Sequence, residues 1–347
     1  GDANIGDTVE FKITMTIPDY QGSWLSDKLH YNIKDSLTDG LTLDVSSIKL
    51  EGTSINDLFV ANKKCTSTSI TTSTSGFTLD LYGEDVYQYA GNTIAITYQA
   101  QVNDKAKVNF DSDENKATLK YSTVASGTDM SDPMQDITHH YTFGFDTLVN
   151  GTGSEKTTEI TKYGVKTTTE LDNKVALDGA QFQLFDANGK QLYFTSAGEY
   201  TTETSGTYDY IVSKNNGQLT ATGLDAGTYT LKESKAPLGY ALDKTTYTIV
   251  ITPTYNELTG ELKNYTVRVS GATGNSITFT HEKLDNGTIN TTDNAANADT
   301  FGINNTPLIT LPETGGAGMI ALTVAAVVLM AGFGTMFVSL RKRKQVK

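Results

Sequence analysis

The feature that most constrains the fold of this chain is the alternation of apolar and polar residues in many short runs. Examples are "TVEFKITMTI", "NTIAITYQAQV", "TTYTIVITPT" and "NYTVRVSG", which are bounded by Gly, Asp, Asn or Pro. A period of two places the apolar side chains on one face of a strand. Little sustained helical periodicity occurs before Met319. Many short strands without alternating helices predict an all-β chain built from antiparallel β-sandwiches.

The length of 347 residues allows two or three domains and a tail. The stretch "DTLVNGTGSEK", residues 146–156, is polar, contains Gly and has no periodic pattern, so we place a boundary there. We therefore predict one sandwich over 1–145 and a second over 146–306. The Thr- and Ser-rich residues 66–76 are either a disordered loop or an edge strand.

The end of the chain predicts a membrane span. Met319–Leu340 contains no charged residue, and a helix of that length spans roughly 33 Å, the thickness of the hydrocarbon core of a bilayer. Residues 341–347 include five basic side chains, which favours a cytoplasmic tail. We therefore expect a transmembrane helix over 319–340, with residues 1–310 outside the cell.

A short motif precedes this span, in the sequence "LPETGG". Pro312 has a fixed φ and Gly315 has no side chain, which suits an extended peptide in an enzyme cleft. The order of motif, span and basic tail resembles the cell-wall sorting signal of Gram-positive surface proteins, which we assign to 307–318 with its recognition residues at Leu311, Pro312, Glu313, Thr314 and Gly315. The resemblance implies that a membrane sortase cleaves between Thr314 and Gly315 and joins Thr314 to an amine. The helix and the charges alone would also fit a simple tail anchor.

Charge and cysteine content exclude other classes of protein. The net charge is −13, and removal of residues 315–347, with five basic and no acidic side chains, leaves −18. This acidity argues against nucleic acid as a partner. Cys65 is the single cysteine, so no internal disulfide can form. An extracellular location requires a signal peptide and none is visible, so we expect the chain to be a piece of a longer precursor.

The second predicted domain carries three motifs in succession: "ALDGAQFQLFDANGK", "GLDAGTYTLKESKAPLGY" and "FGINNTPLITLPETGG". Over roughly residues 160–316 they resemble the collagen-adhesin B-type domain, the immunoglobulin-like module of Gram-positive pilins. In that family a Glu promotes an amide bond between a Lys on the first strand and an Asn on the last. The resemblance places the Glu at Glu233 and the Asn at Asn305, with Asn304 as the alternative. Lys166 is our first choice for the Lys, and Lys162, on the same face, is the alternative.

The three residue types suit this reaction. An amine attacks only when it is neutral, and burial lowers the pKa of a Lys. Burial also favours the protonated form of a carboxylic acid, which can then polarise the Asn carbonyl and deliver a proton to the leaving ammonia. Folding holds the reacting groups together, so the reaction runs once per molecule. Without the surrounding motifs, the same residues would be read as ordinary surface residues of strands.

The first predicted domain shows a weaker resemblance. The runs "NIGDTVEFKITMTIPDY", "YNIKDSLTDGLTL" and "KATLKYST" are similar to the middle domain of pilin backbone subunits, where Asp35 would match the acid of a similar cross-link. The Lys expected upstream of "NIGD" is not in the chain, and Thr123 stands where relatives often have Asn. We therefore make no prediction about a bond there, and whether this domain has a cross-link of its own is left open.

We predict no cofactor, no metal and no enzymatic turnover. "DSDEN", residues 111–115, imitates a calcium loop, but Lys116 and Ser122 stand where that loop needs Gly and Glu. A solvated acidic turn is the preferred interpretation. We find no Ser/His/Asp motif, no zinc spacing and no phosphate-binding Gly loop.

Together these features predict a structural subunit of a Gram-positive cell-surface pilus, with a role in adhesion. The expected partners are sortase, other pilin subunits, peptidoglycan and, before cleavage, the membrane; a host surface ligand is left open. The expected location is the cell wall, after transient membrane anchoring. The alternatives are a wall-anchored adhesin that uses these domains as a stalk, and an anchored enzyme whose catalytic domain has been trimmed away.

Overall fold

The structure is a computed structural model that describes residues 1–55, 57–58, 64–146, 158–165, 174–202, 207–271, 274–294 and 300–308. The chain divides into two compact units, Gly1–Thr306 and Pro307–Lys347. No helix within the described ranges is long and apolar enough to cross a bilayer. The predicted transmembrane helix over 319–340 and basic tail over 341–347 lie outside the described residues.

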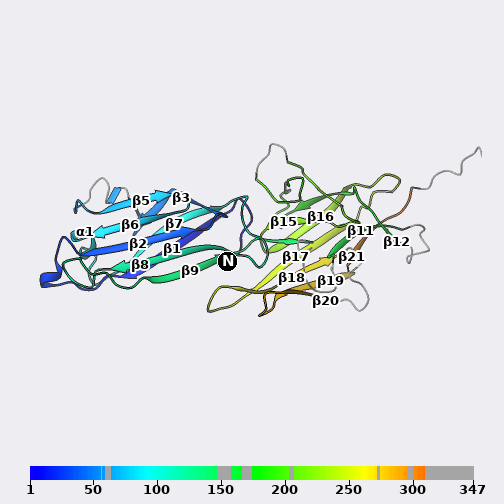
Figure 1. The fold of residues 1–347 in the computed structure, drawn as a ribbon. Coiled ribbons are helices and arrows are strands. Elements are labelled where there is room, and N and C mark those ends of the chain that lie inside the picture. Colours follow the sequence, from blue (N-terminus) through cyan, green and yellow to red (C-terminus); the bar gives the residue numbers. More distant parts are fainter. Residues whose placement is uncertain are drawn as a thin grey trace, which may run out of the picture. The chain divides into compact units, whose positions relative to one another are not determined.

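The amino-terminal part of the first unit consists of two antiparallel sheets (Figure 1). The four-stranded sheet has the order β1-β7-β3-β4 and the five-stranded sheet has the order β5-β6-β2-β8-β9. The strands are β1 (Thr8–Thr16), β2 (His30–Leu37), β3 (Leu41–Leu50), β4 (Thr53–Ser54), β5 (Ser69–Ser73), β6 (Gly76–Tyr82), β7 (Thr93–Val102), β8 (Asp113–Tyr121) and β9 (Met134–His140). A 3-10 turn, η1 (Gly22–Trp24), and a one-turn helix, α1 (Glu84–Tyr87), connect them.

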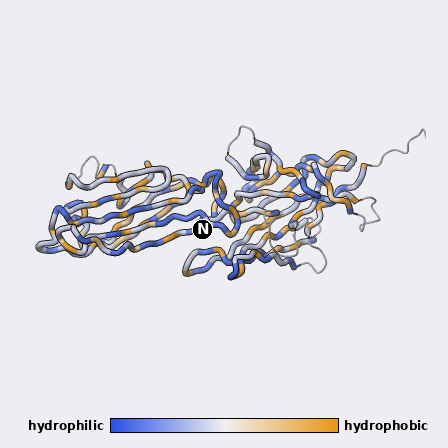
Figure 2. Tube along the Cα trace, viewed as in Figure 1, coloured by the Kyte–Doolittle hydropathy of each residue, from blue (hydrophilic) through white to orange (hydrophobic). Residues whose placement is uncertain are grey.

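The alternation predicted from the sequence builds this sandwich. Along β7, every second residue from Ile94 to Val102 is buried, and apolar and polar residues alternate along the strands in Figure 2. The two sheets meet through their buried faces, where the rings of Phe77 on β6 and Tyr98 on β7 pack edge to face with centroids 5.2 Å apart. The Thr-rich stretch forms an edge strand, β5, paired with β6.

The remainder of the first unit contains a seven-stranded sheet in the order β14-β13-β16-β17-β18-β19-β20 and a three-stranded sheet in the order β12-β11-β21. The strands are β11 (Ile160–Val165), β12 (Lys174–Ala176), β13 (Gln181–Phe185), β14 (Ile211–Val212), β16 (Gly227–Lys235), β17 (Thr246–Tyr255), β18 (Leu262–Ser270), β19 (Ser276–Lys283), β20 (Ile289–Asp293) and β21 (Phe301–Asn305). The described residues therefore confirm the all-β prediction.

Strands β11 and β21, which are distant in the sequence, pair in parallel. Ile160 lies opposite Phe301, and Gly164 lies opposite Asn305. Tyr247 on β17 packs its ring edge to face on Phe301, with centroids 5.8 Å apart. The first and last strands of this part of the chain are therefore neighbours that face the seven-stranded sheet across a buried layer.

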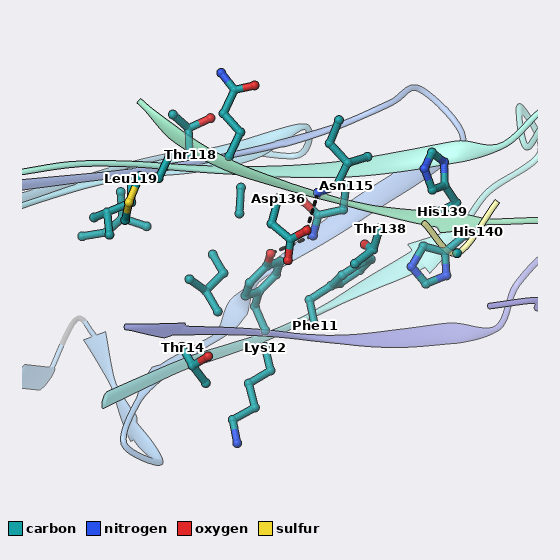
Figure 3. Close-up of a pocket in the computed structure, with 18 of the residues that line it drawn as sticks. Phe11, Lys12, Thr14, Asn115, Thr118, Leu119, Asp136, Thr138, His139 and His140 are labelled. Carbon is teal, nitrogen blue, oxygen red and sulfur yellow. Dashed lines mark hydrogen bonds between the residues drawn. The ribbon is translucent and has the colours of Figure 1, made fainter. Parts of the chain in front are cut away.

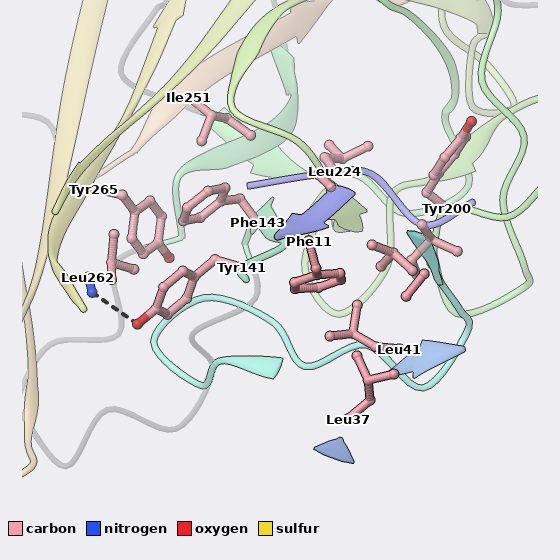
Figure 4. Packing of buried hydrophobic residues seen from close by; sticks show 14 of the residues in the cluster. Phe11, Leu37, Leu41, Tyr141, Phe143, Tyr200, Leu224, Ile251, Leu262 and Tyr265 are labelled. Atoms are coloured by element: carbon pink, nitrogen blue, oxygen red, sulfur yellow. Dashed lines mark hydrogen bonds between the residues drawn. The ribbon is translucent and has the colours of Figure 1, made fainter. Parts of the chain in front are cut away.

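Backbone hydrogen bonds connect the two parts of the first unit. The short strands β10 (Phe143–Phe145) and β15 (Ala221–Leu224) pair with each other. The chain before β1 adds a bond from Ile5 N–H to Gly223 O at 3.0 Å. Leu262 N–H also donates to the hydroxyl of Tyr141 at 3.0 Å (Figure 4). The boundary predicted after residue 145 stays a prediction, since the residues on either side share this small sheet and one continuous apolar core.

Candidate functional site

Three reactive side chains occupy core positions on three different strands. On β16, Tyr229, Leu231 and Glu233 face inward because they alternate with exposed neighbours. On β21 the buried positions include Asn305, and on β11 they include Lys162, whose side chain has no exposed surface. Each of these polar side chains thus lies at a core-facing position of its strand, where an apolar residue is expected. Because a buried polar group is costly without a hydrogen bond, each needs a partner within the core.

These three side chains are one another's partners. Lys162 Nζ donates a hydrogen bond to Asn305 Oδ1 and lies 3.2 Å from Glu233 Oε1. Asn305 Nδ2 donates to both carboxylate oxygens of Glu233, at 3.0 Å to Oε1 and 3.1 Å to Oε2. The amine, the carboxamide and the acid therefore form a closed group in which each contacts the other two.

The surroundings of this group are apolar. The ring of Phe182 lies 5.5 Å from Lys162 Nζ and is fully buried, as is Ile303 beside Asn305 on β21. Burial lowers the pKa of Lys162, and the negative charge and hydrogen bond of Glu233 oppose that shift, as does the charge of Asp243. The environment thus favours the neutral, nucleophilic form of the amine more than water does.

Not all of the predicted site residues fall in this group. Lys166, our first choice for the amine, lies outside the described residues, as do Leu311, Pro312, Glu313, Thr314 and Gly315 of the sorting motif. Asn304, the alternative to Asn305, is half-buried and alternates with it, so it faces away from Glu233. The structure brings together Glu233, Asn305 and the alternative lysine, Lys162.

The first sandwich contains a second acid and carboxamide that share a partner. Asp35 on β2 and Asn115 on β8 are both buried, and the hydroxyl of Tyr98 connects them. Tyr98 donates to Asp35 Oδ2 at 2.5 Å and accepts from Asn115 Nδ2 at 2.7 Å. Burial raises the pKa of Asp35 to about 6, against the hydrogen bonds from Tyr98 and Asn115.

Sequence reasoning missed Asn115 and Tyr98. Thr123, the position compared with the Asn of relatives, is exposed. Asn115 has the same parity along β8 as Ala117 and Leu119, and this parity was the available signal that it faces the core. Both Asp35 Oδ1 and Asn115 Oδ1 are buried without a hydrogen-bond partner among the described residues.

A groove of about 580 Å³ opens beside this pair, between the edge strands β1 and β9 (Figure 3). Its walls include Phe11, Asn115, Leu119 and His140. Burial lowers the pKa of His140 to about 4, helped by the positive charges of the amino terminus and His139, so the ring is neutral at physiological pH. The groove is thus mostly apolar, with the Asn115 carboxamide along one wall.

The acidic stretch at 111–115 differs from the solvated turn that we expected. Asp113 begins β8 and is buried, because its carboxylate accepts hydrogen bonds from Thr38 Oγ1 and Lys107 N–H, each at 2.8 Å. The prediction was wrong for Asp113 and Asn115 since both point inward from the strand. Among the described residues, no group of three or more His, Cys, Asp and Glu side chains could hold a metal ion.

A third buried polar cluster joins the end of β10 to the start of β11. The backbone N–H of Asp146 donates to a carboxylate oxygen of Glu159, and the N–H of Glu159 donates to a carboxylate oxygen of Asp146. His281 Nε2 lies 2.5 Å from the other Glu159 oxygen. Burial raises the pKa of Asp146, and the charge of Glu159 raises it further. These hydrogen bonds therefore join the residue that follows β10 to the residue that precedes β11.

Comparison with known protein families accounts for the domain that holds the Lys162 group. The SpaA family, described as a prealbumin-like fold domain, matches residues 159–266. We refer to the part of the chain that carries this match as the SpaA-type domain. The LPXTG cell wall anchor motif matches residues 303–347. The protein is therefore anchored to the cell wall on the extracellular surface, with its SpaA-type domain on the amino-terminal side of the anchor.

Individual similar proteins extend the likeness over both sandwiches. The trypsin-resistant surface T6 protein of Streptococcus pyogenes serotype M6 is 25% identical over 292 residues, which cover 81% of this chain and 46% of that protein. The chain thus spans about half the length of this curated relative.

Two solved structures share the fold. The T6 backbone pilin of S. pyogenes serotype M6 has a TM-score of 0.53 and 18% identity, covering 88% of this chain and 66% of that one. The group B streptococcus pilus 2b backbone protein has a TM-score of 0.51 and 21% identity, covering 88% of this chain and 95% of that one. The SpaA-type domain and the sandwich before it therefore have the architecture of pilin domains.

Proposed function

We propose that this protein is a structural subunit of a covalently assembled Gram-positive pilus, and that its SpaA-type domain is locked by an amide bond between Lys162 and Asn305. The observation that carries the proposal is the fully buried Lys162, in contact with both the carboxamide of Asn305 and the carboxylate of Glu233. A lysine is almost never fully buried unless it is paired, and here both partners are groups that the reaction needs. The proposal prefers Lys162 over Lys166 because Lys162 has these contacts.

The cross-link forms by aminolysis of the carboxamide. Glu233 takes a proton from Lys162, which leaves a neutral amine next to the Asn305 carbonyl carbon. The amine adds to that carbon, and the protonated acid gives its proton to Nδ2. Glu233 then takes the second proton that Nζ loses as it becomes an amide nitrogen, and passes it to the departing ammonia, which leaves as ammonium. The arrangement on β11, β16 and β21 replaces the substrate-binding step of an enzyme, because folding brings the two reactants together at a high effective concentration. The reaction ends after one event, and the protein is a structural component rather than an enzyme.

Intact mass measurement of the folded protein tests the cross-link. The wild-type chain should weigh less than its sequence by one ammonia, and proteolysis should release a branched peptide containing Lys162 and Asn305. Glu233→Ala should restore the full sequence mass, while the control Glu282→Gln, an exposed position on β19, should not. A wild-type protein of full sequence mass would exclude the bond. A branched peptide containing Lys166 would exclude only the assignment of Lys162.

The second covalent step in the proposal is sorting at the LPETG motif. Sortase cleaves between Thr314 and Gly315 and transfers the Thr314 carbonyl to an amine of another subunit or of peptidoglycan. In cells that express sortase, Pro312→Ala should leave the protein in the membrane fraction. The control Thr310→Ala, one residue outside the motif, should still enter the wall or high-molecular-weight polymers. Polymer ladders that are unchanged by Pro312→Ala on a denaturing gel would contradict this step.

Similarity to backbone pilins favours a polymerised subunit over an adhesin stalk or a trimmed enzyme. The same gel separates these possibilities. A subunit of a polymer gives a ladder of covalent multimers, whereas an adhesin that is attached singly to the wall gives one wall-linked species. A single species would favour the stalk and would leave the internal cross-link unaffected.

A further inference from the structure

The segment that follows β16, residues 236–243 with the sequence "APLGYALD", contacts each of the three strands that carry the reacting groups. We call it the strap. The ring of Tyr240 lies against Gly164 of β11 so closely that a methyl group there would come within 2.5 Å of a ring carbon. Ala241 N–H donates to the carbonyl of Thr306, directly after Asn305, at 2.9 Å. Asp243 N–H donates to Glu233 Oε2 at 2.6 Å.

The last residue of the strap is itself fixed from β17. Asp243 Oδ2 accepts a hydrogen bond from the hydroxyl of Tyr247 at 2.5 Å, and Asp243 Oδ1 accepts one from Thr245 N–H at 2.9 Å. Tyr247 is buried, and its ring packs on Phe301 of β21. The position of the Asp243 N–H is therefore set by a tyrosine that contacts the strand of Asn305.

This N–H makes the two oxygens of Glu233 different. Asn305 Nδ2 donates to both oxygens, at 3.0 Å to Oε1 and 3.1 Å to Oε2. The difference is that Oε2 accepts the 2.6 Å bond from Asp243, whereas Oε1 lies 3.2 Å from Lys162 Nζ. The carbonyl oxygen of a carboxylic acid is the better acceptor, so the oxygen that receives the N–H is the one without the proton. The proton of the neutral acid then lies on Oε1, between the nitrogen that loses a proton and the nitrogen that gains one.

We propose that Asp243 and Tyr247 are positioning residues for the cross-linking reaction, which orient Glu233 so that Oε1 alone carries the proton from Lys162 Nζ to Asn305 Nδ2. The proposal rests on the cross-link of the preceding section. In this scheme the bond from Nζ to the Asn305 carbonyl carbon forms, and the bond from that carbon to Nδ2 breaks. Oε1 takes one proton from the Lys162 ammonium and gives it to Nδ2, then takes the second proton that Nζ loses as it becomes an amide nitrogen and gives it to the departing ammonia, which leaves as ammonium. Glu233 returns to its initial state, and no oxidant or reductant is involved.

The charge of Asp243 adds a second, separable effect. The charged and titratable groups that face Lys162 are Glu233 on β16 and Asp243 on the strap, with Tyr247 on β17 behind Asp243. The negative charge of Asp243 favours the ammonium form and so raises the pKa of Lys162, against the larger effect of burial. Asp243→Asn keeps the backbone N–H and an oxygen that can accept the Tyr247 hydroxyl, and it removes only the charge. More of the amine is then neutral at a given acidic pH.

The test follows bond formation in newly synthesised full-length chains. Samples from a cell-free synthesis are transferred to buffers of different pH, and the loss of one ammonia is followed by intact mass. Tyr247→Phe should slow the reaction at least about tenfold, as expected when a catalytic group is misplaced, and Gly164→Ala should slow it because a methyl group displaces the Tyr240 ring. Asp243→Asn should move the acidic limb of the pH–rate profile to lower pH. The control is Tyr229→Phe, which removes the hydroxyl of a different buried tyrosine, on β16. That hydroxyl donates to Asp225 O at 2.9 Å, and the variant should react at the wild-type rate.

The outcomes separate the two proposals. If the wild-type chain never loses ammonia, the cross-link itself is wrong. If the wild type reacts and both Tyr247→Phe and Gly164→Ala react at its rate, the positioning role is wrong and the cross-link stands. If Tyr247→Phe does not fold, as judged by its melting curve, Gly164→Ala decides, and a Gly164→Ala chain that reacts at the wild-type rate overturns the positioning role.

Discussion

Replacement of Lys162 by Met should remove the cross-link with little other damage. Met fills a similar apolar volume beside Phe182. In the cross-linked wild type Lys162 is an amide and carries no charge, so neither protein has an ion pair here, and in Lys162→Met the Glu233 carboxylate keeps its hydrogen bonds from Asn305 Nδ2 and Asp243 N–H. Lys162 and Asn305 are 143 residues apart, and loop-closure entropy for a chain closed over that length gives about 5 kcal/mol of stabilisation. For a domain of this size, that loss corresponds to a melting temperature lower by roughly 10–20 °C.

The assay combines intact mass with calorimetric melting of the same samples. Lys162→Met should show the full sequence mass for its own composition and the lower melting temperature. Lys174→Met is the matched control, because Lys174 is exposed on β12 and its amine lies over the ring of Tyr163. The Lys174→Met protein should lose one ammonia and should have the melting temperature of the wild type. If Lys162→Met melted at the wild-type temperature although the wild type is cross-linked, the entropic argument would be refuted.

Three further substitutions test the rest of the fold. Burial raises the pKa of Asp35 to about 6, above its value in the unfolded chain. The folded state therefore loses stability as the pH rises from the ordinary Asp pKa through 6. Asp35→Asn should stabilise the protein by about 1–3 kcal/mol in denaturant titrations above pH 6, and it should have little effect below the ordinary Asp pKa. Gly223→Ala should cost about 1–3 kcal/mol in thermal unfolding, since Gly223 has φ 77° and a methyl group would press on Ile5; Gly260→Ala, at φ 72° in open space, isolates the backbone term and should cost less. His281→Ala should cost about 1–3 kcal/mol because it removes the buried hydrogen-bond partner of Glu159 Oε1, and an unchanged stability would contradict that account.

The strand period predicted the fold class, and the family resemblance indicated Glu233 and Asn305, but neither could choose the lysine. Lys162 and Lys166 have the same parity, so both would face the core of one continuous strand. What distinguishes Lys162 is its position relative to Asn305, and this depends on the parallel register of β11 against β21. A register between strands so distant in the sequence depends on packing across the whole domain, which local patterns do not contain.

Asn115 illustrates a different limit of sequence reasoning. The run "DSDEN" looks like a polar turn, because five consecutive polar residues show no apolar alternation. Asp113 and Asn115 are nevertheless core positions, since Thr38 and Tyr98 supply hydrogen bonds from other strands. Such partners come from tertiary structure. A polar residue that is buried with a hydrogen-bond partner from another strand therefore cannot be recognised from composition alone.

The parallel pairing of β11 with β21 determines how the SpaA-type domain carries load. In the proposed pilus, tension would enter at the start of β11 and leave at the end of β21, which are opposite ends of two parallel neighbours. The ladder between them is therefore sheared as a whole instead of being unzipped one bond at a time. An amide at Lys162 and Asn305 would shorten the stretched path to a few residues, so the chain from Tyr163 to Asn304 would carry no tension. The remainder of the domain could then vary in sequence and stability without weakening the fibre along its axis.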